Sequence, residues 1–141
     1  MLLNIHVKDF AIIDEVEVDF SDRLNILSGE TGAGKSIVIG SINAAIGGKV
    51  SKDMIRQGAE YALVEVVFHT KDQHIIDQVK SYDIPIDDGE IIISRKIMKS
   101  RSISRINGET VTLRIVRSIA SLLIDIHGQH DNQNLLDNMK H

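Results

Sequence analysis

The chain has 141 residues, 43% of them hydrophobic and 26% charged, which is the usage of a globular domain with a sizeable core. It contains no cysteine, which excludes disulfides and thiolate metal sites and favours a reducing, cytosolic setting. A net charge of -4 argues against a uniformly basic nucleic-acid binder but is compatible with a local basic patch. No apolar run reaches the roughly 18–20 residues that cross a bilayer, so no membrane association is expected.

Three strands are predicted at the start of the chain. Apolar and polar residues alternate over residues 3–8 and again over residues 15–20, and the short link between them indicates an antiparallel meander. Residues 24–28 lack polar alternation at their centre, so we expect a third strand that is buried on both faces, as parallel strands are. Together with the helices below, these strands predict an α/β fold with a mixed sheet.

A glycine-rich stretch follows the third strand and matches the phosphate-binding pattern G-x-x-x-x-G-K-[ST]. Its glycines allow successive backbone N–H groups to point at one anion. We expect the Lys35 ammonium to bridge the β- and γ-phosphates and the Ser36 hydroxyl to ligate Mg²⁺, while the helix that begins near Lys35 adds the positive end of its dipole. The predicted nucleotide-binding residues are Gly29, Glu30, Thr31, Gly32, Ala33, Gly34, Lys35 and Ser36.

The phosphate-loop helix is predicted over residues 35–46. It is apolar nearly all round, so it should be buried, and Gly47-Gly48 should end it. The remaining predicted elements are a strand over 61–69, a helix over 72–81, a strand at 91–93, a hairpin turn at Asn107-Gly108, a helix that Thr112 caps and that runs through Leu123, and a short helix around 135–139.

Lysine and arginine accumulate between residues 94 and 118, where Glu109 is the only acid. Such a patch can hold DNA phosphates by counterion release without reading sequence, although a solvated hairpin that balances acidic surface elsewhere would look the same. The absence of aromatic residues argues against base stacking. The DNA hypothesis involves Arg95, Lys96, Lys99, Arg101 and Arg105.

Residues 122–125 carry a second possible signal. A self-contained NTPase needs an apolar strand that ends in an aspartate beside Mg²⁺, and this segment would make Asp125 that residue. Short apolar runs ending in Asp are common, however, and no guanine-reading N-K-x-D is present. A DNA-binding module with a vestigial nucleotide site is a third possibility.

Six separated segments resemble, in order, the N-terminal lobe of the RecN family of bacterial DNA repair proteins, which are SMC-like ATPases of the ABC class. The most distinctive motifs are Gly-Glu-Thr-Gly-Ala-Gly-Lys-Ser at 29–36 and Ile-His-Gly-Gln-His at 126–130. The other segments are 8–15, 55–58, 94–97 and 105–109.

The resemblance implies one ATP-binding half of a head that acts in double-strand break repair and recombination. In the family a coiled coil and a C-terminal lobe follow, and that lobe supplies the signature motif, the acidic Mg²⁺-binding strand and the catalytic glutamate. The chain shows none of these, so we expect residues 1–141 to be a lobe that needs the missing C-terminal lobe and a second head of a homodimer. Its setting would be cytoplasmic and nucleoid-associated, and the isolated chain should hydrolyse ATP negligibly.

The resemblance also implies roles for single residues. Gln129 would be the glutamine-loop residue that reaches Mg²⁺ and the attacking water, and would share the catalytic role with Lys35. Asp125 would be a strand-end residue without a metal role. Arg56 lies where an arginine of such heads can approach nucleotide or DNA. The equal alternative is a solvated surface arginine or one that pairs with a nearby carboxylate.

Overall fold

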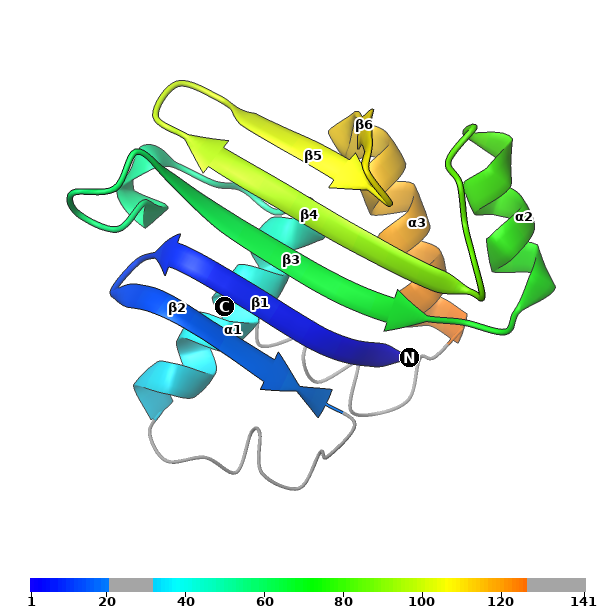
Figure 1. Ribbon diagram of the computed structural model, residues 1–141, viewed down its shortest axis with the longest axis horizontal. Helices are drawn as coiled ribbons and strands as arrows, with labels where there is room; N and C mark the ends of the chain where they lie inside the picture. Colours follow the sequence, from blue (N-terminus) through cyan, green and yellow to red (C-terminus); the bar gives the residue numbers. More distant parts are fainter. Residues whose placement is uncertain (21–31, 127–141) are drawn as a thin grey trace.

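The described part of the chain, residues 1–20 and 32–126 of the computed structural model, forms one sheet with helices on one of its faces (Figure 1). The neighbouring strands follow the order β2-β1-β3-β4-β5-β6, and every adjacent pair is antiparallel. The strands are β1 (Leu2–Phe10), β2 (Ile13–Asp19), β3 (Tyr61–His69), β4 (Glu90–Met98), β5 (Ser102–Ile106) and β6 (Glu109–Val111).

The predicted β1–β2 meander is confirmed by its antiparallel register, in which Ile5 lies opposite Val18 and Val7 opposite Val16. The predicted parallel strand at residues 24–28, which would make the sheet mixed, lies outside the described residues. The predicted helix around 135–139 also lies outside them.

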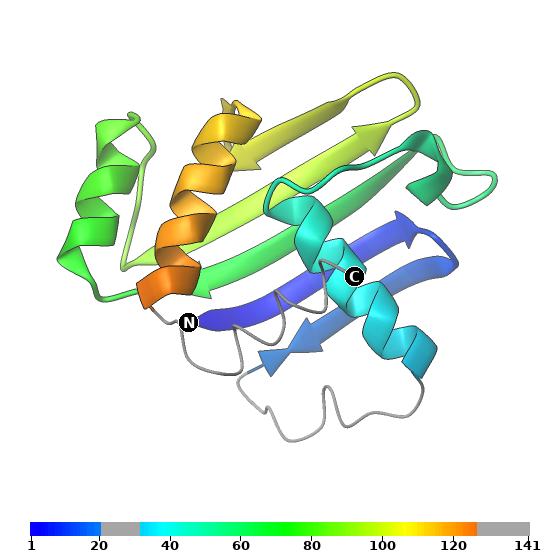
Figure 2. The same ribbon diagram turned by 180° about the vertical axis from the view of Figure 1, so that it is seen from behind.

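Two helices cover the inner face of the sheet, as Figure 2 shows from behind. α1 (Gly32–Ala45) packs across β1, β3 and β4, and α3 (Leu113–Ile126) packs against β5. α2 (Gln73–Ser81) lies beside α3, and the short 3-10 helix η2 (Lys52–Met54) precedes β3. No described helix has the length and apolar character that crossing a bilayer requires.

The core lies between this inner face and the helices. Alternate residues of β3 and β4 are buried, as the period of a strand requires, and they meet apolar side chains of α1 and α3. The main buried side chains are Ile5, Val7, Ala62, Val64, Val66, Ile91, Ile93, Ile97 and Ile106 of the sheet, with Ile42, Ala45, Val116, Ile119 and Leu123 of the helices.

The ends of the helices follow the predicted chemistry. α1 begins at Gly32, three residues earlier than predicted, and ends at Ala45. Gly47 follows with a φ of 108°, which favours glycine. The Asp72 carboxylate caps α2 by accepting from the His74 and Ile75 amides at 2.8 and 3.3 Å. Thr112 Oγ1 accepts from the Ile115 amide at 3.3 Å, so the predicted cap of α3 is confirmed.

The predicted strand at 91–93 is only the start of β4, which extends from Glu90 to Met98. The Ser- and Arg-rich span therefore belongs to the β4–β5 hairpin, where β4 pairs with β5. The predicted turn at Asn107-Gly108 is confirmed, and both residues have positive φ, 50° and 88°.

Asp125 is not at the end of a strand. Residues 122–125 form the last turn of α3, and Leu123 is buried in the core. Apolar residues recur at Val116, Ile119 and Leu123, which is helical spacing, so the short run 122–124 continues the helix. The acidic strand of the self-contained NTPase, and the strand-end position expected for Asp125 from the family resemblance, were both wrong.

Candidate nucleotide site and basic surface

The phosphate-binding motif leads into α1. The first turn of this helix holds residues 32–35, and the first four N–H groups of a helix have no acceptor within it. Those donors and the positive end of the helix dipole suit an anion. Gly29, Glu30 and Thr31 lie outside the described residues, as do the side chains of Ala33 and Lys35.

Ser36 is exposed at this end of α1, whereas the rest of the helix is held against the sheet. Ile39, Ile42 and Ala45 are buried, and the buried Ser41 hydroxyl donates to Val38 O at 2.8 Å. A helix of 14 residues is about 21 Å long, so its packed body presents the phosphate-binding turn from a rigid support.

The segment that would carry the second predicted catalytic group follows α3. This helix ends at Ile126, and Gln129 lies outside the described residues, so the roles of Lys35 and Gln129 stay predictions. α1 and α3 cover the same face of the sheet (Figure 2). Within residues 1–20 and 32–126, no three histidine or acidic side chains are grouped in a way that could hold a metal ion.

Arg95 does not belong to a basic surface, because only 3% of its surface is exposed to solvent. It lies on the inner side of β4, in phase with Ile91, Ile93 and Ile97. Its Nη1 donates to Ala44 O at 2.8 Å and to Gly48 O at 2.6 Å, and its Nε donates to Ser102 Oγ at 3.1 Å. Burial, together with repulsion from Arg117, lowers the pKa of Arg95 from its ordinary value. The alternation of buried and exposed residues along β4 was the signal that could have distinguished the buried Arg95 from its accessible basic neighbours.

The other members of the predicted patch are accessible. Lys99 and Arg101 lie at the tip of the β4–β5 hairpin and are exposed, as is Arg105 on β5. Lys96 is half-exposed, and its Nζ lies 4.3 Å from the centroid of the Tyr61 ring, a cation–π contact. The basic surface therefore consists of Lys96, Lys99, Arg101 and Arg105, on the hairpin and on the face of the sheet that α1 and α3 leave uncovered.

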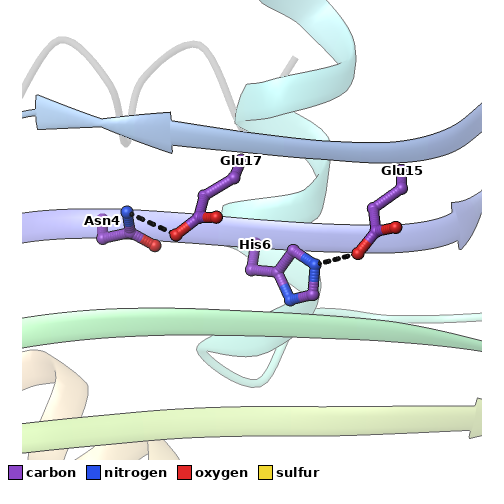
Figure 3. Close-up of polar contacts among 4 residues, drawn as sticks. All are labelled: Asn4, His6, Glu15 and Glu17. Atoms are coloured by element: carbon purple, nitrogen blue, oxygen red, sulfur yellow. Dashed lines mark hydrogen bonds and ion pairs between the residues drawn. The ribbon is translucent and has the colours of Figure 1, made fainter.

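The opposite side of this outer face is acidic (Figure 3). His6 Nε2 lies 2.6 Å from Glu15 Oε2, and Asn4 Nδ2 donates to Glu17 Oε2 at 3.2 Å. Glu65 on β3 lies directly across from His6. Lys8 of β1, exposed and directly opposite Glu15, is a cation on this side, but acidic residues outnumber it on β1 and β2. A polyanion would therefore meet more favourable charge on the β4–β5 side.

Arg56 lies near the turn between β1 and β2. Its amide donates to Asp9 O at 2.8 Å, and the neighbouring Ile55 forms an isolated bridge with Phe10. The exposed guanidinium lies 3.9 Å from Asp14 Oδ1. The surface ion pair expected as an alternative is therefore present, and such an exposed pair contributes little to stability.

The class of the protein follows from these features. A phosphate-binding motif that leads into a helix packed under a sheet is the arrangement of a nucleotide-binding domain, and the chain belongs to the AAA domain family, which it matches over residues 4–140.

Similarity to individual proteins is more specific. Over 143 aligned residues the chain is 42% identical to DNA repair protein RecN of Halalkalibacterium halodurans and 41% identical to that of Bacillus subtilis. The alignments cover 100% of this chain and 25% of each relative, so the chain spans about a quarter of their length. The predicted resemblance to the RecN family is confirmed.

Solved structures share the fold. A chain from a study of ATP-driven dimerization and DNA-stimulated activation of SMC ATPases has a TM-score of 0.68 at 22% identity, with 98% of both chains covered. An Smc head bound to the C-winged helix domain of ScpA has a TM-score of 0.62 at 23% identity, covering 87% of this chain and 41% of that one. RecF with ATP has a TM-score of 0.55 at 16% identity over 84% of this chain and 30% of that one. The predicted fold class, an SMC-like ATPase head lobe, is therefore confirmed.

Proposed function

We propose that the chain is the ATP-binding N-terminal lobe of a RecN-type ATPase that acts in DNA double-strand break repair and recombination. The observation that carries this proposal is the phosphate-binding motif at the start of a helix packed under an SMC-like sheet, in a chain similar to RecN throughout. The full-length protein would act in the cytoplasm on the nucleoid. Its lobe would bind Mg-ATP, and binding would drive closure on a second head of a homodimer.

In the proposed nucleotide site, different residues contact the phosphates and Mg²⁺. Backbone amides of residues 29–34 hold the phosphates, Lys35 neutralises the β- and γ-oxygens, and Ser36 and Gln129 approach Mg²⁺. Mg²⁺ would supply charge neutralisation at the phosphates. Asp125 lies in α3, so the residue that the self-contained NTPase needs at the end of an apolar strand is not on a strand, and this alternative is not favoured. Hydrolysis would need groups from the C-terminal lobe.

A nucleotide titration tests the proposal. The full-length protein should bind Mg-ATP, and Lys35→Ala should weaken binding at least about tenfold because a charge-assisted phosphate contact is lost. Lys49→Ala, at an exposed position just beyond α1, is the matched control and should bind like the wild type. Chain 1–141 alone should bind nucleotide without appreciable turnover. Rapid turnover by this chain, lost in Asp125→Ala, would contradict the proposal and restore the self-contained enzyme.

We further propose that the basic surface binds the DNA backbone. Four cations on one hairpin, separated from the acidic side of the sheet, suit sequence-independent phosphate contacts. Arg95 is excluded from this role by its burial. Replacing Lys99, Arg101 and Arg105 by glutamine should lower the slope of log affinity against log salt by about 3, one unit for each lost contact.

The matched control replaces three exposed lysines elsewhere, Lys52, Lys71 and Lys80, and should leave the slope unchanged. Equal losses in both triple variants would mean that only net charge matters. DNA affinity that survives without any nucleotide binding by the wild type would instead favour a module with a vestigial nucleotide site.

A further inference from the structure

The C-terminal end of α1 is held by two arginines. The last carbonyls of a helix lack a full set of intrahelical donors, and here guanidinium groups bond to one carbonyl of the last turn, Ala44 O, and to those of Gly47 and Gly48 just beyond the helix. Arg95 Nη1 donates to Ala44 O and Gly48 O at 2.8 and 2.6 Å, and Arg117 Nε donates to Gly47 O at 2.9 Å. The negative end of the helix dipole therefore faces two positive charges, which is the favourable arrangement.

The burial of Arg95 carries a desolvation cost. The ion pairs within the described residues are His6–Glu15 and Arg56–Asp14, so neither arginine of the cap has a carboxylate partner there. Burying an unpaired charge costs several kcal/mol unless hydrogen bonds and dipoles offset it. Isoleucine occupies the equivalent inward positions of β4 at 91, 93 and 97 without that cost. A charge here supplies something that an apolar side chain lacks, namely directional bonds to the end of a helix.

The two arginines come from different parts of the fold. Arg95 belongs to β4, and its Nε also bonds to Ser102 Oγ of β5 at 3.1 Å, whereas Arg117 belongs to α3. Gly47 admits Arg117 at close range, because a Cβ built on this glycine would lie 2.6 Å from Arg117 Cγ. The end of α1 is thus bonded at once to the hairpin and to α3.

α1 connects the cap to the phosphate-binding motif. Its first turn, residues 32–35, lies at the end of the helix that is opposite to the cap. A change of angle at the cap displaces that first turn in proportion to helix length, about 1.5 Å per residue.

We propose that Arg95 and Arg117 are positioning residues of the nucleotide site, which set α1 against the sheet and α3 and so hold the first turn of α1, residues 32–35, in the orientation that binds the phosphates. The inference rests on the proposed function. It predicts that loss of either guanidinium weakens ATP binding by folded protein, although neither side chain lies in the phosphate-binding motif.

The test uses the full-length protein with Arg95→Met and Arg117→Met, which keep an unbranched apolar stem and remove the guanidinium. The matched controls are Arg114→Met, exposed on α3, and Lys80→Met, exposed on α2. Thermal unfolding without nucleotide is recorded first. Mg-ATP affinity is then titrated at a temperature well below the lowest unfolding midpoint.

The cap variants should lose ATP affinity about tenfold, within the range of couplings that packed elements carry, while the controls stay within about twofold. The double variant should lose less than the product of the single losses, because both bonds hold one helix end. Arg95→Lys and Arg117→Lys, which keep the charge, should recover part of the affinity. If Arg95→Met does not fold, Arg117→Met and the lysine variants carry the test.

Cap variants that unfold at lower temperature yet bind ATP like the wild type would overturn the inference, because the arginines would then be structural only. That result leaves the proposed function intact. A wild-type protein that binds no ATP would overturn the proposed function, and this inference with it.

Discussion

Arg95 and Arg105 show how differently two arginines of one hairpin are used. Arg95 on β4 is 3% exposed and donates to backbone carbonyls at the end of α1, whereas Arg105 on β5 is exposed on the outer face. Each lies directly across from a serine of the partner strand, Ser104 and Ser94. The inner face of the sheet uses a cation as a structural bond, and the outer face presents cations to solvent. A count of charge along the sequence cannot separate these roles, because it ignores the two-residue period of a strand.

The largest effect should separate the two faces at adjacent residues of β4. Ile93 is fully buried under the helices, so Ile93→Ala should lower the free energy of unfolding by about 3 kcal/mol. Ile92 lies half-buried on the outer face, and Ile92→Ala should cost about 1 kcal/mol. Urea unfolding of both variants measures the difference. Equal costs would mean that the outer face is covered as completely as the inner one.

The next largest effect should come from replacing Arg95 and Arg105. Arg95→Met should lower the free energy of unfolding by about 2 kcal/mol, since Ala44 O and Gly48 O lose a charged donor in a buried place. Arg105→Met should change it by less than about 0.5 kcal/mol, as exposed substitutions do. Parallel denaturant titrations of the two variants provide the check. A larger loss in Arg105→Met than in Arg95→Met would reverse the assignment of the faces.

The smallest effect concerns two serines of β5. Ser102 Oγ accepts from Arg95 Nε, whereas the buried Ser104 Oγ has no hydrogen-bond partner in the described part of the chain. Ser102→Ala should cost about 1 kcal/mol, and Ser104→Ala should be neutral within about 0.5 kcal/mol or slightly stabilising. Differential scanning calorimetry of the two variants would show the order of their midpoints. A clear loss in Ser104→Ala would reveal a partner for that hydroxyl.

Local chemistry made much of the fold predictable. The turn at Asn107-Gly108 follows from the ease with which these residues adopt positive φ, and the cap of α3 follows from Thr112. The Asn107 side chain also donates to Pro85 O at 2.7 Å and accepts from the Ile92 amide at 2.7 Å. Those partners are distant in sequence, so no local pattern could predict them.

Each wrong prediction treated a short segment apart from the periodicity of the helix or strand that contains it. The run at 122–124 suggested a strand when taken alone, but it continues the helical spacing that starts at Leu113. Arg95 was grouped with its basic neighbours although it shares the parity of the buried isoleucines of β4. The phosphate-binding motif was recognisable because one short segment contains all its chemistry. The cap of α1 was not, because its two arginines meet only after β4, β5 and α3 have packed.

Gly47 makes the arginine cap vulnerable at a residue that has no functional group. Its φ of 108° and the nearness of the Arg117 stem leave no space for even one methyl group. Alanine at this position would force the Arg117 side chain away from Gly47 O while leaving both guanidinium groups in the protein. On the proposal above, a single added carbon at a residue outside the phosphate-binding motif would then weaken ATP binding.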